Sequence, residues 1–223
     1  MHVIQVKYLI EAELKGNDAM PSPEKFRQTL DDFNVEPALI DEMNQGFGKL
    51  ESKTNKKIKT AFFTQALKVM NHRLPPEKVQ EVFEANACCK SGVREKNSKE
   101  FARINARLDT SGRLKLISAR PYLNMGSAEL DEEGFLLVHA LSYHPGDNFE
   151  CACPTLSKIK RDDAIPREYC WCCGGHFKYH YKIMLSLKLR LADIVSSPHD
   201  TDGEKPCAFR YEILNTERLL AQH

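Results

Sequence analysis

Cysteine residues are concentrated in one short part of this chain. Of the eight cysteines among 223 residues, five fall between residues 151 and 173. They are Cys151, Cys153, Cys170, Cys172 and Cys173, whereas Cys88, Cys89 and Cys207 lie elsewhere. A chain of this length can bury a core without disulfide bonds, and clustered cysteines in a reducing compartment more often bind metal or do redox chemistry. Three interpretations stay open: a metal site, redox or catalytic thiols, and buried inert cysteines.

The composition is that of an ordinary globular protein. The formal net charge is +1, and 42% of the residues are hydrophobic. These values exclude a disordered chain and lack the basic character of most nucleic-acid-binding domains. The longest apolar run, residues 135–141, is interrupted by His139 and is far shorter than the ~20 residues of a membrane span. Residues 1–7 lack the apolar segment of a signal peptide, so we expect a cytoplasmic protein that contacts neither nucleic acid nor membrane.

The first half of the chain has the pattern of helices. Ser22 and Pro23 form a helix start, and Phe26, Leu30 and Phe33 follow at helical spacing. Further helices are expected over 36–44, over 55–72, from Pro75 to about residue 88, and from Ser98 to about residue 108. The lysines between residues 49 and 59 are expected to lie in solvent.

The pattern changes at Asp109-Thr-Ser-Gly112, which has the composition of a turn. Strands are expected over 113–119, 135–143 and 208–214, and a long helix over about 173–192. We therefore predict an α+β fold, in which an N-terminal helical segment precedes a small antiparallel sheet with a long helix packed on it. The regions 1–108 and 109–223 are expected to form one compact unit.

Two cysteine segments have the character of two halves of one thiolate site. Cys151-Ala-Cys153-Pro154 is the first, and Cys170-Trp-Cys-Cys-Gly-Gly-His176 is the second. Zinc takes four nitrogen or sulfur ligands in a tetrahedron, so two such segments can close around one ion. An iron–sulfur cluster ranks below zinc because the ferredoxin spacings are absent. The candidate metal ligands are Cys153, Cys170, Cys172, Cys173, His176 and Cys207.

The second segment stands where the long helix is expected to begin. The positive end of the helix favours a thiolate at Cys172 or Cys173, and Gly174-Gly175 allow another backbone to approach closely. His176 follows Cys173 by one turn and shares a helical face with His180. Cys172 or Cys173 as nucleophile, with His176 or His139 as general base, would make a hydrolase, although histidines on such faces are also common as hydrogen-bonded core residues.

The order of these segments resembles that of the 4-vinyl reductase domain and of the related 2-aminothiazoline-4-carboxylate hydrolase family. The similarity covers roughly residues 109 to 214. It implies a small α/β domain that binds a small organic ligand, with a structural zinc ion beside the ligand pocket. It also implies that Cys153, Cys207 and one of the cysteines at 170, 172 and 173 hold that zinc. The string from Tyr169 to Tyr181 is also similar to an uncharacterised bacterial cysteine-rich family, which implies no activity.

These observations predict a cytoplasmic zinc-binding protein with a small-molecule pocket between the long helix and the sheet. If the metal has four protein ligands it is structural, and if it keeps an open position the protein is a small-molecule hydrolase. A thiol redox protein that uses the pairs Cys88-Cys89 and Cys172-Cys173 is a further alternative. A homo-oligomer is compatible with the sequence.

Overall fold

The first part of the fold is a group of four helices. The computed structural model describes residues 22–88, 90–120, 123, 125–140, 148–151, 153, 155 and 165–214. The helices are α2 (Pro23–Asp32), α3 (Pro37–Asn44), α4 (Lys56–Arg73) and α5 (Pro76–Ala85). Side-chain oxygens cap two of them, because Ser22 accepts from the Lys25 amide and Asn55 from the Lys57 amide. The helical first half is therefore confirmed.

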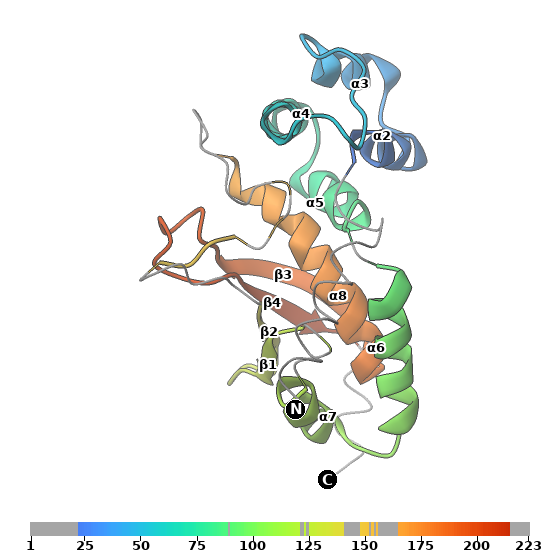
Figure 1. The fold of residues 1–223 in the computed structure, drawn as a ribbon, viewed down its shortest axis with the longest axis vertical. Helices are drawn as coiled ribbons and strands as arrows, with labels where there is room; N and C mark the ends of the chain where they lie inside the picture. Colours follow the sequence, from blue (N-terminus) through green and yellow to red (C-terminus); the bar gives the residue numbers. More distant parts are fainter. Residues whose placement is uncertain are drawn as a thin grey trace, which may run out of the picture.

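Aromatic side chains contact one another in the core of this helical region. Phe26 meets Phe63 edge to face at 5.3 Å between ring centroids, and Phe63 meets Tyr169 in the same way at 5.6 Å. Such edge contacts place the positive ring edge on the negative ring face. The helical region occupies the top of Figure 1, with α5 closest to the rest of the molecule.

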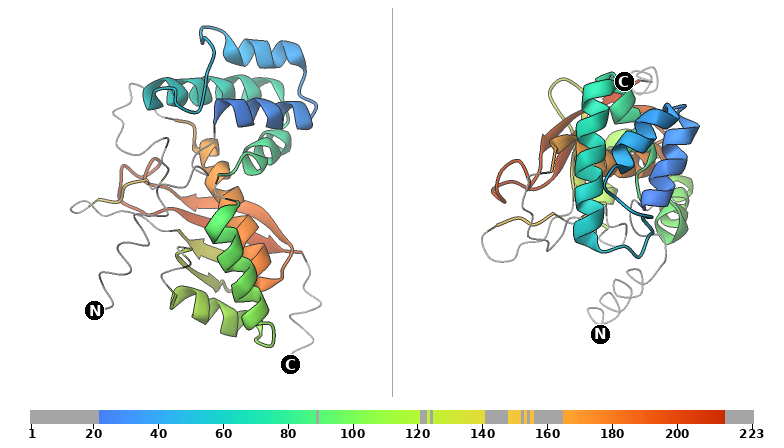
Figure 2. Two further views of the ribbon diagram at one scale, coloured as in Figure 1. Left: turned by 45° about the vertical axis from the view of Figure 1, so that its right-hand side comes forward. Right: turned by 90° about the horizontal axis from the view of Figure 1, so that it is seen from above.

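The second part of the fold is a sheet covered by helices. Helices α6 (Gly92–Ile104), α7 (Thr110–Ser118) and α8 (Trp171–Leu185) accompany the strands β1 (Ser127–Leu130), β2 (Leu136–His139), β3 (Leu189–Ser196) and β4 (Ala208–Ile213). The strand order is β1-β2-β4-β3, and every neighbouring pair is antiparallel. A short 3-10 helix, η2 (Arg167–Cys170), leads into α8. Figure 2 shows α6, α7 and α8 beside the sheet, so the predicted α+β class is confirmed.

The long helix α8 lies at the centre of the molecule, with α5 and α6 on one side and β3 on the other. Its inner face carries Phe177, Tyr181 and Met184, which pack on strand residues such as Phe209 and Tyr211. The Tyr181 hydroxyl donates to the Met125 carbonyl at 3.3 Å, which satisfies a polar group inside an otherwise apolar core.

One expected strand is a helix instead. Residues 113–119 belong mainly to α7, whose first amide groups are capped because Asp109 accepts from the Gly112 amide at 2.7 Å. Asp, Thr, Ser and Gly are typical of turns, but Asp is also a preferred helix N-cap. Leu114 and Ile117 are buried three residues apart, as a helix requires. The strand prediction for 113–119 was therefore wrong.

The expected length of the long helix was also wrong. Helix α8 ends at Leu185, where Ser186 takes the left-handed conformation (φ 58°), and β3 then covers residues that we expected to be helical. Neither Gly nor Pro marks this stop, so the usual helix-end signal is missing. Helix α6 begins at Gly92 rather than near Ser98, and the sequence did not predict β1. Cys89, residues 141–147 and Pro154 lie outside the described residues.

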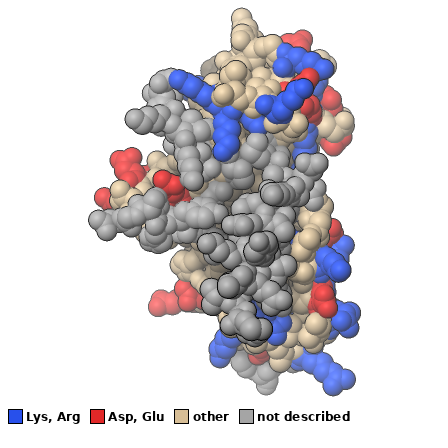
Figure 3. Space-filling model, viewed as in Figure 1, with Lys and Arg blue, Asp and Glu red and all other residues tan. Residues whose placement is uncertain are grey.

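The lysine-rich stretch before α4 is only partly in solvent. Lys59 is 1% exposed, and its Nζ donates to the Ser52 carbonyl at 2.8 Å, so the expectation of a solvated side chain was wrong there. Figure 3 shows basic and acidic side chains close together over the helical region on the face drawn, in keeping with the low net charge. Within the described residues no helix is long and apolar enough to span a bilayer.

Candidate functional site

The cysteines gather where the helical region meets the sheet region. Cys151, Cys153 and Cys172 belong to the core of the helical region, whereas Cys170 and Cys207 belong to the core of the sheet region. Cys173 packs against both cores from the first turn of α8. All seven described cysteines are free thiols. The fold therefore brings together thiols from the 151–153 segment, from α8 and from the start of β4.

Four of these thiols form a chain of contacts. The Cys151 thiol hydrogen-bonds with both Cys153 and Cys207, and the Cys153 thiol in turn hydrogen-bonds with Cys173. The Cys153 amide donates to Cys151 Sγ at 3.4 Å. Backbone N–H groups that point at sulfur stabilise a thiolate there. We call Cys151, Cys153, Cys173 and Cys207 the thiol cluster.

The thiol cluster is electrostatically uneven. The hydrogen bond from Cys151 lowers the pKa of Cys207. Hydrogen bonds with Cys153 and Cys207, together with burial, raise the pKa of Cys151. The pKa of Cys173 is also raised, first by its hydrogen bond with Cys153 and then by burial. The cluster thus joins one thiol whose pKa is lowered to two whose pKa values are raised, and buried thiols of the second kind lose their protons only if a cation compensates the charge.

Two buried hydroxyl groups flank the cysteines. The Tyr169 hydroxyl lies near Cys153, Cys172 and Cys173, and burial followed by the negative charges of Cys153 and Cys172 raises its pKa. Among the described residues it makes no hydrogen bond of normal geometry, although Thr155 lies near enough to oppose that rise. Ser197 Oγ is also buried without a bond of normal geometry to any described residue, and it lies beside the Cys170 thiol. Both hydroxyls are donors that a thiolate could accept from.

The part of the chain that the structure describes contains no group of three or more Cys, His, Asp or Glu side chains already arranged as a metal site. The thiols of the cluster instead hydrogen-bond to one another. Cysteine binds zinc as thiolate, so uptake of a metal requires loss of these protons and of the bonds that they make.

Cys170 and Cys172 lie beside the cluster rather than within its chain of contacts. Cys170 is buried near Ser197, and burial followed by the charge of Cys207 raises its pKa well above the usual range. Cys172 turns toward α5, where its Sγ lies 3.9 Å from the Asn86 carbonyl oxygen. Cys151 was not among the expected metal ligands, although its position two residues before Cys153 could have indicated that it belongs to the same site.

His176 faces away from the thiol cluster. Its Nδ1 lies 3.1 Å from the Cys88 carbonyl oxygen, and its Nε2 lies 3.3 Å from a guanidinium nitrogen of Arg94. Because the carbonyl can only accept, Nδ1 carries the hydrogen and Nε2 is the acceptor. Burial, followed by the charges of His180 and Arg94, lowers the pKa of His176 to about 3. Its imidazole is therefore neutral, and both nitrogens have partners on the side of α6.

The other two histidines considered from the sequence lie apart. His139 is on the face of the sheet away from α8, with its Nε2 3.4 Å from Glu129 on the neighbouring strand. His180 is fully buried, with its Nδ1 2.9 Å from the Ser98 hydroxyl of α6. The structure therefore does not bring His139, His176 and Cys172 together at one place.

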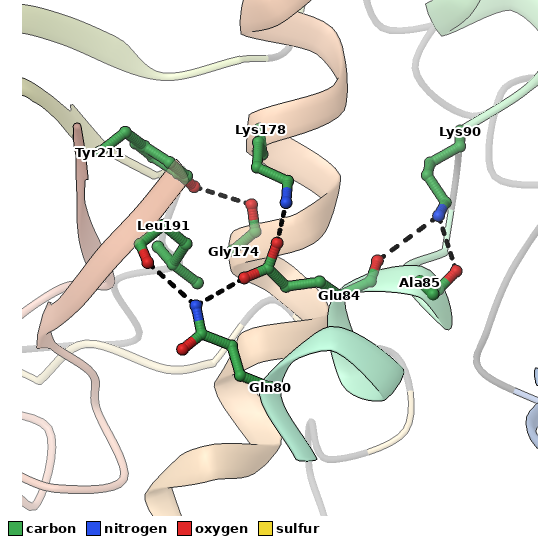
Figure 4. Close-up of polar contacts among 8 residues, drawn as sticks. All are labelled: Gln80, Glu84, Ala85, Lys90, Gly174, Lys178, Leu191 and Tyr211. Atoms are coloured by element: carbon green, nitrogen blue, oxygen red, sulfur yellow. Dashed lines mark hydrogen bonds and ion pairs between the residues drawn. The ribbon is translucent and has the colours of Figure 1, made fainter. Parts of the chain in front are cut away.

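The Gly174-Gly175 pair explains how the elements around the site come so close. A Cβ atom on Gly175 would lie 2.5 Å from the carbonyl oxygen of Glu84 in α5. A Cβ atom on Gly174 would lie 2.5 Å from a methyl group of Leu191 in β3. In Figure 4 the Gly174 carbonyl also accepts from Tyr211, at 2.8 Å. Both neighbours can reach the α8 backbone only because these two positions lack side chains.

Polar contacts complete this junction. Gln80 of α5 donates to the Leu191 carbonyl of β3 at 2.9 Å and to the Glu84 carboxylate at 2.7 Å (Figure 4). Glu84 also forms an ion pair with Lys178 of α8, whose side chain points at it. The thiol cluster thus lies beside a well-defined contact between the two regions.

Comparison of the chain with protein-family models, with curated proteins and with solved structures finds no match. The resemblance to the 4-vinyl reductase and 2-aminothiazoline-4-carboxylate hydrolase families therefore stays a prediction.

Proposed function

We propose that this is a zinc-binding protein in which Cys151, Cys153, Cys173 and Cys207 hold one structural zinc ion. The chain of contacts from Cys207 through Cys151 and Cys153 to Cys173 carries the proposal. It supplies four sulfur ligands from three separate segments, which is the number that closes a tetrahedral zinc site. With four protein ligands no position remains for a reacting water molecule, so the role is structural.

The surroundings support a charged thiolate site. Zinc with four thiolates has a net charge of −2, which must be compensated in a buried place. Cys173 lies in the first turn of α8, where the helix dipole is positive and no acidic side chain is present. The Cys153 amide and the Tyr169 hydroxyl are donors that lie close to the cluster sulfurs. Outer contacts of this kind orient metal ligands and stabilise their charge.

The position of the cluster suggests what the zinc would do. It would tie the 151–153 segment and the start of β4 to α8, between the two cores. The seven free thiols agree with a reducing compartment, and we propose the cytoplasm.

Metal analysis of the full chain purified under reducing conditions tests the proposal. We expect about one zinc per chain, and loss of that zinc in Cys151→Ser and Cys207→Ser. Cys88→Ser is the matched control, because Cys88 is partly exposed and outside the cluster, and it should keep the metal. An iron–sulfur cluster would instead give coloured protein that contains iron and sulfide. Metal-free protein whose stability a chelator does not change would falsify the zinc assignment.

A thiol redox function is the second candidate, because the same contacts place Cys151 beside Cys207 and Cys153 beside Cys173. Each disulfide would release two hydrogen atoms to an added oxidant such as diamide. Metal-free protein that loses four hydrogen atoms in intact-mass analysis, reversibly and at these four cysteines, would support the redox function over zinc.

A further inference from the structure

The C-terminal end of α5 brings together groups from three parts of the chain. Lys90 Nζ donates to the Ala85 carbonyl at 2.7 Å, and Lys25 Nζ donates to the Ala87 carbonyl at 3.1 Å. The Cys172 thiol lies against the carbonyl of Asn86, between these two. Figure 4 shows the Lys90 side chain reaching back to the end of α5. Two ammonium groups and the start of α8 therefore surround residue 86.

The polar side chain of Asn86 is buried and unsatisfied within the described part of the chain. The residue is 0% exposed, and neither its Nδ2 nor its Oδ1 has a hydrogen-bond partner among the residues that the structure describes. Buried polar groups in native proteins are nearly always satisfied, so such a group requires an explanation. The side chain is not needed for the helix end, because the backbone of Asn86 has ordinary angles (φ −76°, ψ 3°) and makes the capping bonds by itself.

The charge around Asn86 is positive. The pKa of Lys90 is lowered first by burial and then by the charge of Lys25, while the Cys172 and Cys88 thiols oppose this effect. Glu84, the nearby carboxylate, is already paired with Lys178. Lys90 Nζ also donates to the Glu84 carbonyl at 3.4 Å (Figure 4). An ammonium group has three donor hydrogens, so a donor of each lysine remains beyond the bonds to these carbonyls. This environment favours an anion.

We propose that Asn86, Lys25 and Lys90 form a binding site for a small organic acid that also carries a hydrogen-bond donor. The acid's carboxylate accepts from the ammonium groups and from Asn86 Nδ2, and its hydroxyl or amino group donates to Asn86 Oδ1. This ligand would use every group that is unsatisfied at this place. The site is separate from the thiol cluster and does not depend on bound zinc.

Small two-carbon probes test this ligand chemistry. Glycolate carries both the carboxylate and the donor, acetate carries only the carboxylate, and ethylene glycol carries no charge. We expect glycolate to raise the melting temperature of the full chain more than acetate does, and ethylene glycol to have no effect, since a ligand that binds only the folded state stabilises it. Sodium chloride at equal ionic strength serves as the control for screening.

Substitutions then assign the effect to residues. Asn86→Leu, similar in shape, should abolish the glycolate shift and should raise the melting temperature without ligand by about 2–4 °C, because an unsatisfied amide is removed. Lys90→Met should also abolish the shift, whereas the exposed Lys96→Met should leave it unchanged. Zinc content, measured in the same samples, should stay constant.

Three results would overturn the inference. One is equal stabilisation by glycolate and sodium chloride. Another is a glycolate shift that survives both Asn86→Leu and Lys90→Met. The third is a lower melting temperature of Asn86→Leu without ligand, which would mean that the amide is structural. If Asn86→Leu does not fold, Lys90→Met against Lys96→Met decides between a specific and a general charge effect.

Discussion

The helical region and the sheet region are stabilised in different ways. In the helical core, aromatic rings touch one another edge to face among aliphatic side chains, as Phe26, Phe63 and Tyr169 do. The sheet core is also mainly aliphatic, but its tyrosines donate hydrogen bonds to buried carbonyls. Where the two regions meet, Gly174 and Gly175 allow α5 and β3 to approach the α8 backbone closely. Hydrogen bonds, an ion pair and the thiol cluster lie at the same junction. The difference shows that apolar burial stabilises each region, whereas the junction depends on a few specific contacts.

Removal of metal is expected to have the largest effect, and it tests whether the junction depends on zinc. Structural zinc sites in small peptides supply on the order of 10 kcal/mol, so a chelator should strongly lower the free energy of unfolding. Hydrogen exchange should quicken in residues 165–175 and 206–208, while α2 and α4 keep their protection. Uniform loss of protection over both regions would show that the cluster does not act locally.

Gly175→Ala tests the backbone contact between α5 and α8. The new Cβ would meet the Glu84 backbone, which cannot rotate away, so we expect a loss of about 3 kcal/mol in denaturant unfolding. Gly174→Ala meets a Leu191 methyl group that can move, and about 1 kcal/mol is expected. Gly48→Ala, with no atom within 4 Å, is the control and should be close to neutral. Equal values for all three variants would contradict this account.

Mild acid should weaken the contact between α6 and α8 through His176. Its pKa is lowered to about 3 when folded, whereas an unfolded histidine titrates near 6.5, so below about pH 6.5 the unfolded state binds more protons. The stabilisation is present above that pH and is lost as the pH falls toward 3. Arg94 of α6, Lys90 of the preceding loop and His180 of α8 face the imidazole and oppose its charge.

At pH 5 this effect amounts to about 2 kcal/mol relative to neutral pH. Urea unfolding at pH 7 and pH 5 measures it, and His176→Asn should remove most of the difference. His139→Asn, on the outer face of the sheet, should leave it in place. If His176→Asn retains the full pH dependence, another group is responsible.

The smallest effect is expected on the outer face of the sheet, far from the junction. Arg190 and Glu212 pair across β3 and β4, but the arginine side chain is 66% exposed. Exposed ion pairs contribute little, so Arg190→Ala should cost about 0.5 kcal/mol in denaturant unfolding, and added salt should reduce that cost. A loss above about 2 kcal/mol would show that specific polar contacts matter as much here as at the junction.

The sequence by itself determined most of the helical region and the place of the site. Helix starts at Ser22 and Asn55 were readable because capping is a local interaction between neighbouring residues. The clustering of cysteines and the Gly174-Gly175 pair also indicated where segments had to meet. Asp109 was misread because the same residue type favours turns and helix caps, and α8 ended at Ser186 without a local stop signal. The alternation of Leu187, Leu189 and Leu191 was a strand signal that we read as helix.

Only the tertiary structure decided which polar groups meet. The sequence drew attention to the cysteines Cys151, Cys172 and Cys207. It could not show that the Cys151 thiol hydrogen-bonds with Cys207 while the Cys172 thiol lies against the Asn86 carbonyl. Nor could it show that Asn86 is buried with its amide unsatisfied. Such contacts join residues far apart in the chain, and they depend on the side of α8 from which each segment approaches. Local propensity carries no information about that direction, because packing between separate elements sets it.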